Sequence, residues 1–131
     1  MKKYMLDTNI CIYLIKKCPP EIVKKFDNYR KGEIIISAIT WAELCCGIKK
    51  EGRDTVENLL SVLDVEPFGI KQADKYGELT HFFPNRKANF DRMIAAHAIS
   101  LNVTLVTNNI DDFYSYTRVG LSTENWVSSH K

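Results

Sequence analysis

Three consecutive isoleucines, Ile34-Ile35-Ile36, constrain the fold of this chain more than any other feature. β-Branched side chains favour strands, and a strand without alternating polar residues is buried on both faces. Strands of this kind occur in parallel sheets, because each crossover connection places a helix over one face of the sheet. The run therefore predicts an α/β fold built on a parallel sheet.

The rest of the chain alternates short apolar runs with amphipathic segments, as a parallel sheet requires. Further strands are expected at Lys3–Leu6, Val65–Phe68, Thr104–Val106 and Leu121–Trp126. Helices are expected at Ile10–Lys17, Glu21–Asn28, Thr40–Lys49, Arg53–Leu63, Ile70–Phe82 and Asp91–Leu101. In the fifth of these helices Ile70, Ala73 and Gly77, with Thr80 or His81, share one stripe, which we expect to face the core.

The composition indicates one domain that covers residues 1–131. Single domains most often have about 100–150 residues, and 45% apolar with 26% charged residues is ordinary for a folded protein. No apolar run approaches the ~20 residues of a membrane span. Asp7 interrupts the N-terminal segment before a signal-peptide core can form, so we expect a cytoplasmic protein with no membrane segment.

The cysteines and histidines do not form a recognisable zinc or disulfide pattern. The four cysteines contain no C-x-x-C pair, and the adjacent Cys45-Cys46 would bridge only with strain. The three histidines have no metal-ligand spacing to any cysteine. We therefore expect free thiols that pack as small apolar residues.

Polar residues follow two of the expected strands or lie near the start of a helix. Ligands of open α/β sheets bind at the carboxyl ends of the strands, so these residues are candidates for a common site. They are Asp7, Glu43, Asp91, Asn108, Asn109, Asp111 and Asp112.

Each candidate also has a purely structural explanation. Asp7-Thr8-Asn9 offers caps for the following helix. Glu43 lies three residues after Thr40, as in a capping box. Asp91 would be a first-turn acid favoured by the helix dipole, and Asn109 would cap the next segment.

Helical periodicity favours a functional role for two of the acids. Asp91 shares its helix face with apolar residues at i+3, i+4 and i+7, and Glu43 shares its face with small or apolar residues. An ionised carboxylate on a buried face costs several kcal/mol unless it is compensated. A shared cation would compensate it, and a site of oxygen ligands suits Mg²⁺ or Mn²⁺ rather than zinc.

Four segments, in this order, resemble the successive motifs of PIN-domain proteins, and in particular those of VapC toxins. The segments are Met5–Asn9, Ser37–Leu44, Asp91–Ala98 and Leu105–Asn109. The resemblance covers nearly the whole chain, through Glu124–Trp126. It implies a PIN-like α/β/α sandwich whose central, mostly parallel sheet has four or five short strands.

The resemblance also implies the activity and the metal. A VapC-like toxin is an endoribonuclease that depends on Mg²⁺ or Mn²⁺ and hydrolyses RNA through a metal-activated water. By the motifs of the family, Asp7 and Asp91 would bind the metal directly, and Glu43 would complete the acidic site.

Further residues would support this site, and the chain departs from the family at two places. Thr8 or Thr107 would orient a ligand or a water. Many members carry a fourth acid where Asn109 stands here, which makes Asp112 the candidate for the missing catalytic charge. Phe82–Phe90 replaces the Gly-rich loop that usually precedes the third motif, a change that bears on substrate choice.

The resemblance implies an RNA substrate, a homodimer and a VapB-like antitoxin that silences the toxin. Arg86, Lys87 and Arg92 flank the third motif and are candidates for contacts with RNA phosphates. The antitoxin would lie in a groove near the active site, for which the candidate lining residues are Tyr13, Leu14 and Trp41, with ordinary core packing as the alternative. The aromatic side chains Phe82, Phe83 and Phe90 are expected in the core or a dimer interface rather than stacked on bases.

Two other functions fit parts of the sequence. A phosphatase with an N-terminal aspartate nucleophile would need a second acid at the position of Asn9, which disfavours it. A non-catalytic RNA- or protein-binding module with a decayed PIN fold gains some support from Asn109. It would not require Asp7, Glu43 and Asp91 together on one chain.

Overall fold

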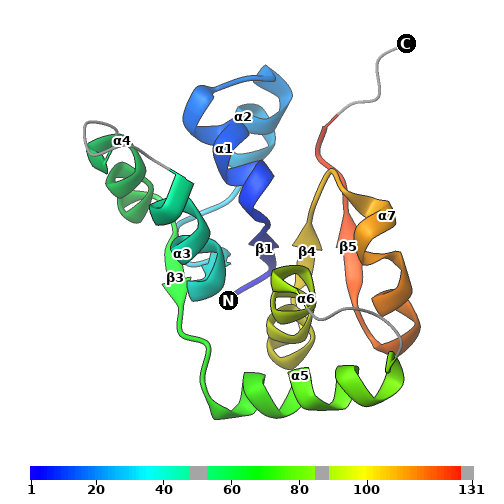
Figure 1. Cartoon of the computed structure of the whole chain (residues 1–131). Helices are drawn as coiled ribbons and strands as arrows, with labels where there is room; N and C mark the ends of the chain where they lie inside the picture. The colour runs from blue at the N-terminus through cyan, green and yellow to red at the C-terminus, as the bar shows by residue number, and fades with distance from the viewer. Residues whose placement is uncertain (48–52, 85–88, 128–131) are drawn as a thin grey trace.

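Five strands form one parallel sheet in the order β3-β2-β1-β4-β5 (Figure 1). The structure is a computed structural model that describes residues 1–47, 53–84 and 89–127. The strands are β1 (Tyr4–Leu6), β2 (Ile34–Ser37), β3 (Asp64–Glu66), β4 (Thr104–Val106) and β5 (Ser122–Glu124). All four pairings between neighbouring strands are parallel. The prediction of an α/β fold with a mostly parallel sheet of four or five strands is therefore confirmed.

Helices cover both faces of this sheet. They are α1 (Thr8–Lys16), α2 (Pro20–Phe26), α3 (Ala38–Gly47), α4 (Arg53–Glu57), α5 (Ile70–Phe82), α6 (Phe90–Leu101) and α7 (Ile110–Phe113), with 3₁₀ helices η2 (Asn58–Ser61) and η3 (Tyr114–Val119). Because strand side chains alternate between the faces, Met5 and Leu105 join one core with α5 and α6, whereas Leu6 and Val106 join another with α1 and α2. The result is an α/β/α sandwich.

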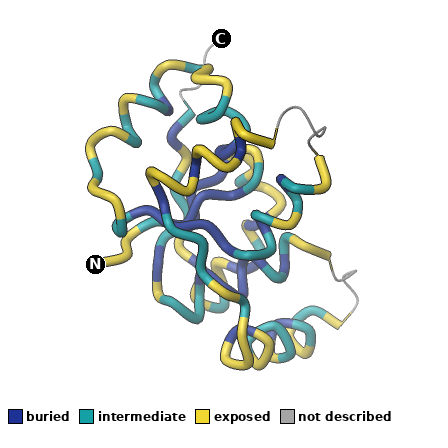
Figure 2. Tube along the Cα trace, turned by 90° about the vertical axis from the view of Figure 1, so that its left-hand side faces the viewer, coloured by how far each residue is buried: buried dark blue, intermediate teal, exposed yellow. Residues whose placement is uncertain are grey.

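The isoleucine run occupies the interior that its composition predicts. Ile34, Ile35 and Ile36 have at most 2% of their surface exposed, and Figure 2 shows the buried part of the trace passing through the middle of the molecule. The strand predicted at Val65–Phe68 is β3, at the edge of the sheet, where Pro67 is exposed and lies just outside the ladder.

The packed face predicted for α5 is wrong. Ile70 is 82% exposed and Ala73 is also exposed, whereas Gln72 and Leu79 are buried. Gln72 tolerates burial because its carboxamide accepts from the Gly69 N–H at 2.9 Å and donates to the Ser100 hydroxyl at 3.0 Å.

The cysteines follow the expectation only in part. The four cysteines are free, as expected, but Cys11 alone is buried and Cys18 and Cys46 are exposed. Within the described ranges, no helix is both long and apolar enough to cross a membrane.

Candidate active site

The site lies where the chain changes direction across the sheet. From β1 the chain proceeds to β2 and β3 on one side, and it later returns to form β4 and β5 on the other. Ligands of open α/β sheets bind at such a switch point, outside the carboxyl ends of the strands. Asp7 directly follows β1 and Thr107 directly follows β4, so both lie at this point.

Asp7 is held firmly in place. It is 4% exposed, and it caps α1 by accepting from the Ile10 N–H at 3.0 Å through Oδ1. Its other oxygen accepts a hydrogen bond from the Thr107 hydroxyl. Thr107 Oγ1 in turn accepts from the Asn109 N–H at 2.9 Å, which leaves its single proton for Asp7. Asp7 is thus both a helix cap and an oriented carboxylate.

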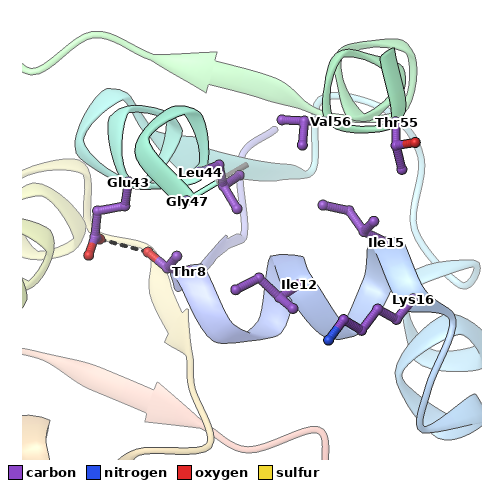
Figure 3. Close-up of a pocket in the computed structure, with 9 residues that line it drawn as sticks. All are labelled: Thr8, Ile12, Ile15, Lys16, Glu43, Leu44, Gly47, Thr55 and Val56. Carbon is purple, nitrogen blue, oxygen red and sulfur yellow. Dashed lines mark hydrogen bonds between the residues drawn. The ribbon is translucent and has the colours of Figure 1, made fainter. Parts of the chain in front are cut away.

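Glu43 comes from α3 and is oriented by Thr8, the first residue of α1. The Thr8 hydroxyl donates to Glu43 Oε1 at 2.7 Å, a contact that Figure 3 shows as a dashed line. A capping box is not formed, because α3 already begins at Ala38 and Ser37 Oγ accepts from the Ile39 N–H at 3.0 Å. Glu43 therefore lies inside the helix and is free of any capping role.

Asp91 belongs to the first turn of α6 and is half-buried. The N-cap of α6 is Asn89, whose side chain accepts from the Arg92 N–H at 3.0 Å. Capping is therefore assigned to Asn89, and Asp91 is not required for it.

The three carboxylates interact electrostatically. Burial raises the pKa of Asp7 above its ordinary value, and the negative charges of Asp91 and Glu43 raise this pKa further. The hydrogen bonds from Thr107 and Ile10 act in the opposite direction. Two carboxylates from distant segments of the chain are thus close enough to disfavour ionisation of Asp7.

A hard divalent cation fits this donor set. Each of the three acids supplies carboxylate oxygens, which are ligands that Mg²⁺ and Mn²⁺ prefer, and a cation would relieve their mutual repulsion. In the described ranges no three His, Cys, Asp or Glu side chains already lie close enough together to form a metal cluster. The fit therefore rests on the chemistry and electrostatic coupling of Asp7, Glu43 and Asp91.

Asp112 lies elsewhere. It is exposed and lines a second hollow of about 390 Å³ beyond the end of β4. The same hollow is lined by Asn109, whose backbone N–H joins it to Thr107. The structure therefore couples Asp7 with Glu43 and Asp91 and places Asp112 in the separate hollow.

The prediction that Arg92 contacts RNA needs correction. Its side chain is 1% exposed, and its guanidinium donates to the Tyr116 hydroxyl, the Thr80 hydroxyl and the Phe83 carbonyl oxygen at 3.3–3.4 Å. A guanidinium enclosed by these groups is not available to a substrate phosphate. The other two candidates, Arg86 and Lys87, lie outside the described residues.

The aromatic residues around α5 and α6 differ in exposure. Phe82 and Phe90 are exposed, which excludes a core position for them and leaves the predicted dimer interface as the other alternative. Phe83 is partly buried and packs edge-on against Tyr116, with ring centroids 5.3 Å apart.

An apolar hollow of about 430 Å³ borders Glu43 (Figure 3). It is lined by Thr8, Ile12, Ile15, Lys16, Glu43, Leu44, Gly47, Thr55 and Val56. These residues come from α1, α3 and α4. The predicted groove residues Tyr13, Leu14 and Trp41 are not among them, so the lining follows the neighbouring positions Ile12 and Ile15.

The sequence did not determine the role of His97. It is fully buried, its Nδ1 lies 2.8 Å from Ser37 Oγ, and its Nε2 has no partner among the described residues. Burial lowers the pKa of His97 to about 4. The side chain is therefore a neutral core residue. A partner 60 positions away in the chain left no local signal in the sequence.

Comparisons with known proteins agree with this geometry. A family model described as "PIN domain" matches residues 4–119. Ribonuclease VapC2 of Haemophilus influenzae is 38% identical over 135 residues, which span 97% of this chain and 100% of that protein. The tRNA(fMet)-specific endonuclease VapC of Shigella flexneri is 36% identical, covering 96% of this chain and 99% of that protein.

Solved structures of VapBC complexes also contain chains similar to this one. The crystal structure of DNA-bound VapBC from Salmonella typhimurium contains a chain with a TM-score of 0.87 and 32% identity, covering 97% of this chain and 100% of that chain. In VapBC2 from Rickettsia felis, bound to a promoter DNA fragment, the values are 0.78 and 37%, covering 95% and 98%.

Proposed function

The chain belongs to the PIN-domain family, and from this premise we propose that it is a metal-dependent endoribonuclease, the toxin of a toxin–antitoxin pair. The observation that carries the proposal is the electrostatic coupling of Asp7, Glu43 and Asp91 at the switch point of the sheet. The full-length similarity to VapC ribonucleases supports the same activity. Because the proposed substrate is cellular RNA, the proposed place of action is the cytoplasm.

The proposed metal is Mg²⁺ or Mn²⁺, held by Asp7, Glu43 and Asp91. When bound, such an ion lowers the pKa of a water and offsets the negative charge that develops on the phosphate. Two threonines of this chain orient the carboxylates that would hold the ion. Thr107 fixes one oxygen of Asp7, and Thr8 fixes Oε1 of Glu43.

The attacking water must lose a proton during hydrolysis of the phosphodiester. Glu43 Oε1 accepts from Thr8 and keeps a second lone pair for the metal, so we assign the other oxygen, Oε2, as the acceptor of that proton. Attack at the phosphorus then breaks the bond to the 3′ oxygen, and the departing 3′ oxygen takes a proton from solvent water, which leaves a 5′-phosphate and a 3′-hydroxyl. Asp112 is proposed to add negative charge from the neighbouring hollow.

The proposed protein partner is a VapB-like antitoxin, and the proposed oligomer is a homodimer. Related chains were solved as VapBC complexes. The apolar hollow beside Glu43 is the proposed seat of the antitoxin, because a peptide bound there would also cover the acidic site.

Digestion of RNA tests the activity. The purified chain is expected to cut single-stranded RNA with Mg²⁺ or Mn²⁺ and to stop when a chelator is added. Asp7→Asn and Asp91→Asn are expected to lower the rate at least 100-fold, because each removes a proposed metal ligand. Asp54→Asn is a matched control, since Asp54 is exposed on α4 and does not line the hollow that borders Glu43.

Two results would contradict the proposal. Cleavage that persists in the chelator would exclude a metal-dependent mechanism. Equal rates of cleavage by Asp7→Asn and Asp54→Asn would exclude the proposed active site. RNA that is bound but left intact would indicate the alternative, a non-catalytic binding module.

A further inference from the structure

Apart from the charge proposed for Asp112, the polar hollow beside the acidic site has no role in the hydrolysis described above. It has a volume of about 390 Å³ and is lined by Asn108, Asn109, Ile110, Asp111, Asp112 and Asn125. These residues lie beyond the carboxyl ends of β4 and β5, next to the strand that Asp7 follows. The Thr107 hydroxyl connects the two places, since it bonds both Asp7 and the Asn109 N–H.

Two carboxamides in this hollow are held in fixed orientations. Asn125 Nδ2 donates to Asn108 Oδ1 at 3.1 Å, and Asn125 Oδ1 accepts from the Val127 N–H at 2.9 Å. Within the described part of the chain, neither N–H of the Asn108 carboxamide has an acceptor. Asn108 is exposed, so these two donors are available to a ligand.

The charges of the lining exclude a phosphate as the occupant. Among the described residues that line the hollow there is no Lys, Arg or His, whereas Asp111 and Asp112 contribute two carboxylates. A phosphate would be repelled there. An uncharged group that carries both donors and acceptors would instead find a partner for each, from the Asn108 N–H groups and the Asp111 carboxylate.

The edge of an unpaired nucleobase has this combination of donors and acceptors. We propose that the hollow binds the base of a nucleotide adjacent to the cleaved phosphodiester, and that Asn108, positioned by Asn125, determines which base is preferred. The inference rests on the proposed function for the identity of the substrate, because it assumes that RNA crosses the acidic site.

Nuclear magnetic resonance of the ¹⁵N-labelled chain tests the inference without requiring cleavage. The probes are the four trinucleotides AAA, CCC, GGG and UUU, added in separate titrations with Mg²⁺ omitted. The side-chain NH₂ signals of Asn108 and Asn125 are expected to shift, and one trinucleotide is expected to bind about tenfold more tightly than the weakest.

Asn108→Asp is the discriminating variant. It retains an oxygen that accepts from Asn125 Nδ2, so the local structure is preserved, but it replaces the two outward N–H donors with a second oxygen. We expect the tenfold preference to be lost or transferred to another base. Asn28→Ala, an exposed asparagine in the turn after α2, is expected to keep the wild-type preference.

Two outcomes of these titrations would contradict the inference. Unshifted NH₂ signals with all four trinucleotides would overturn the inference, and so would an Asn108→Asp variant that keeps the wild-type preference. A separate digestion of RNA with Mn²⁺ tests the proposed function alone. If the chain binds trinucleotides with a base preference but does not cut RNA, the proposed base-binding subsite is supported and the proposed nuclease activity is rejected.

Discussion

The hydroxyl of Thr107 shows how one residue defines the chemistry of another. Its oxygen accepts from the Asn109 N–H, so its only proton is directed to Asp7. This bond favours the ionised form of Asp7 and opposes the burial that raises its pKa. Thr107 therefore favours a carboxylate that is both charged and oriented, as a metal ligand must be.

His97 makes stability depend on pH. Its pKa is about 4 in the folded chain and about 6.5 when unfolded. As the pH falls below 6.5 the unfolded chain takes up a proton that the folded chain does not bind until pH 4, so the free energy of unfolding decreases. We expect His97 alone to lower this free energy by about 3 kcal/mol at pH 4.

Urea unfolding at pH 7 and pH 4 measures this effect. His97→Gln removes the titrating group, and its difference in stability between the two pH values should be smaller than that of the wild type. His81→Gln, at an exposed position of α5, is the control and should follow the wild type. Equal pH dependence in wild type and His97→Gln would show that His97 does not contribute.

At this scale the sequence indicated residues within its motifs, such as the acids and the threonines Thr8 and Thr107, better than pairs formed between distant segments. Asp7 was apparent because it ends a strand, and Asp91 because an acid on a buried face requires compensation. The bond between Ser37 and His97 and the bond between Asn108 and Asn125 join segments distant in sequence. Such pairs depend on the path of the chain in space, and a single sequence does not report it.

Arg92 links three elements on one side of the sheet. From α6 its guanidinium reaches Thr80 in α5, the Phe83 carbonyl after α5, and Tyr116 in η3. A buried charge is tolerated only when hydrogen bonds replace its water, and these oxygens supply them. The same contacts connect both neighbouring segments to the helix that carries Asp91.

Arg92→Met is therefore expected to destabilise the fold by about 3 kcal/mol, because it leaves buried oxygens without their donor. Guanidinium unfolding would measure the change. Arg118→Met is the control, because Arg118 is exposed in η3, and it should change stability by less than about 0.5 kcal/mol. If Arg92→Met kept full stability but bound RNA more weakly, the original assignment as a phosphate contact would be correct.

Secondary structure was predicted most accurately where burial leaves few alternatives. β1, β2 and β4 lie within about one residue of their predicted positions, because their apolar runs are buried on both faces. The buried face of α5 was wrong because a glutamine takes a core position through two hydrogen bonds. Hydrophobic periodicity does not detect a polar residue that is satisfied in this way.

Over the whole molecule, the acidic site lies between two hollows of different character. The apolar one is formed by α1, α3 and α4 beside Glu43, and the polar one lies beyond β4 and β5. An apolar peptide segment suits the first and an uncharged polar group suits the second. In the proposed function, the antitoxin would reach the acidic site from the apolar hollow and the RNA base would lie in the polar one.

Placing a charge in the apolar hollow is expected to release the antitoxin. Ile12 lines this hollow and is half-buried on α1. Ile12→Asp would oblige a bound apolar segment to bury a carboxylate without a partner, a cost of several kcal/mol. We expect affinity for the VapB-like antitoxin, measured by calorimetry with the purified proteins, to fall at least 100-fold.

Leu60→Asp provides the matched control, because Leu60 is an exposed apolar residue of η2 that does not line the hollow. Its affinity should stay within about threefold of the wild type, and thermal unfolding followed by circular dichroism should establish that both variants are folded. Wild-type affinity in a folded Ile12→Asp variant would place the antitoxin on another surface. The acidic site would then have to be silenced from the polar side, in competition with the base of the RNA.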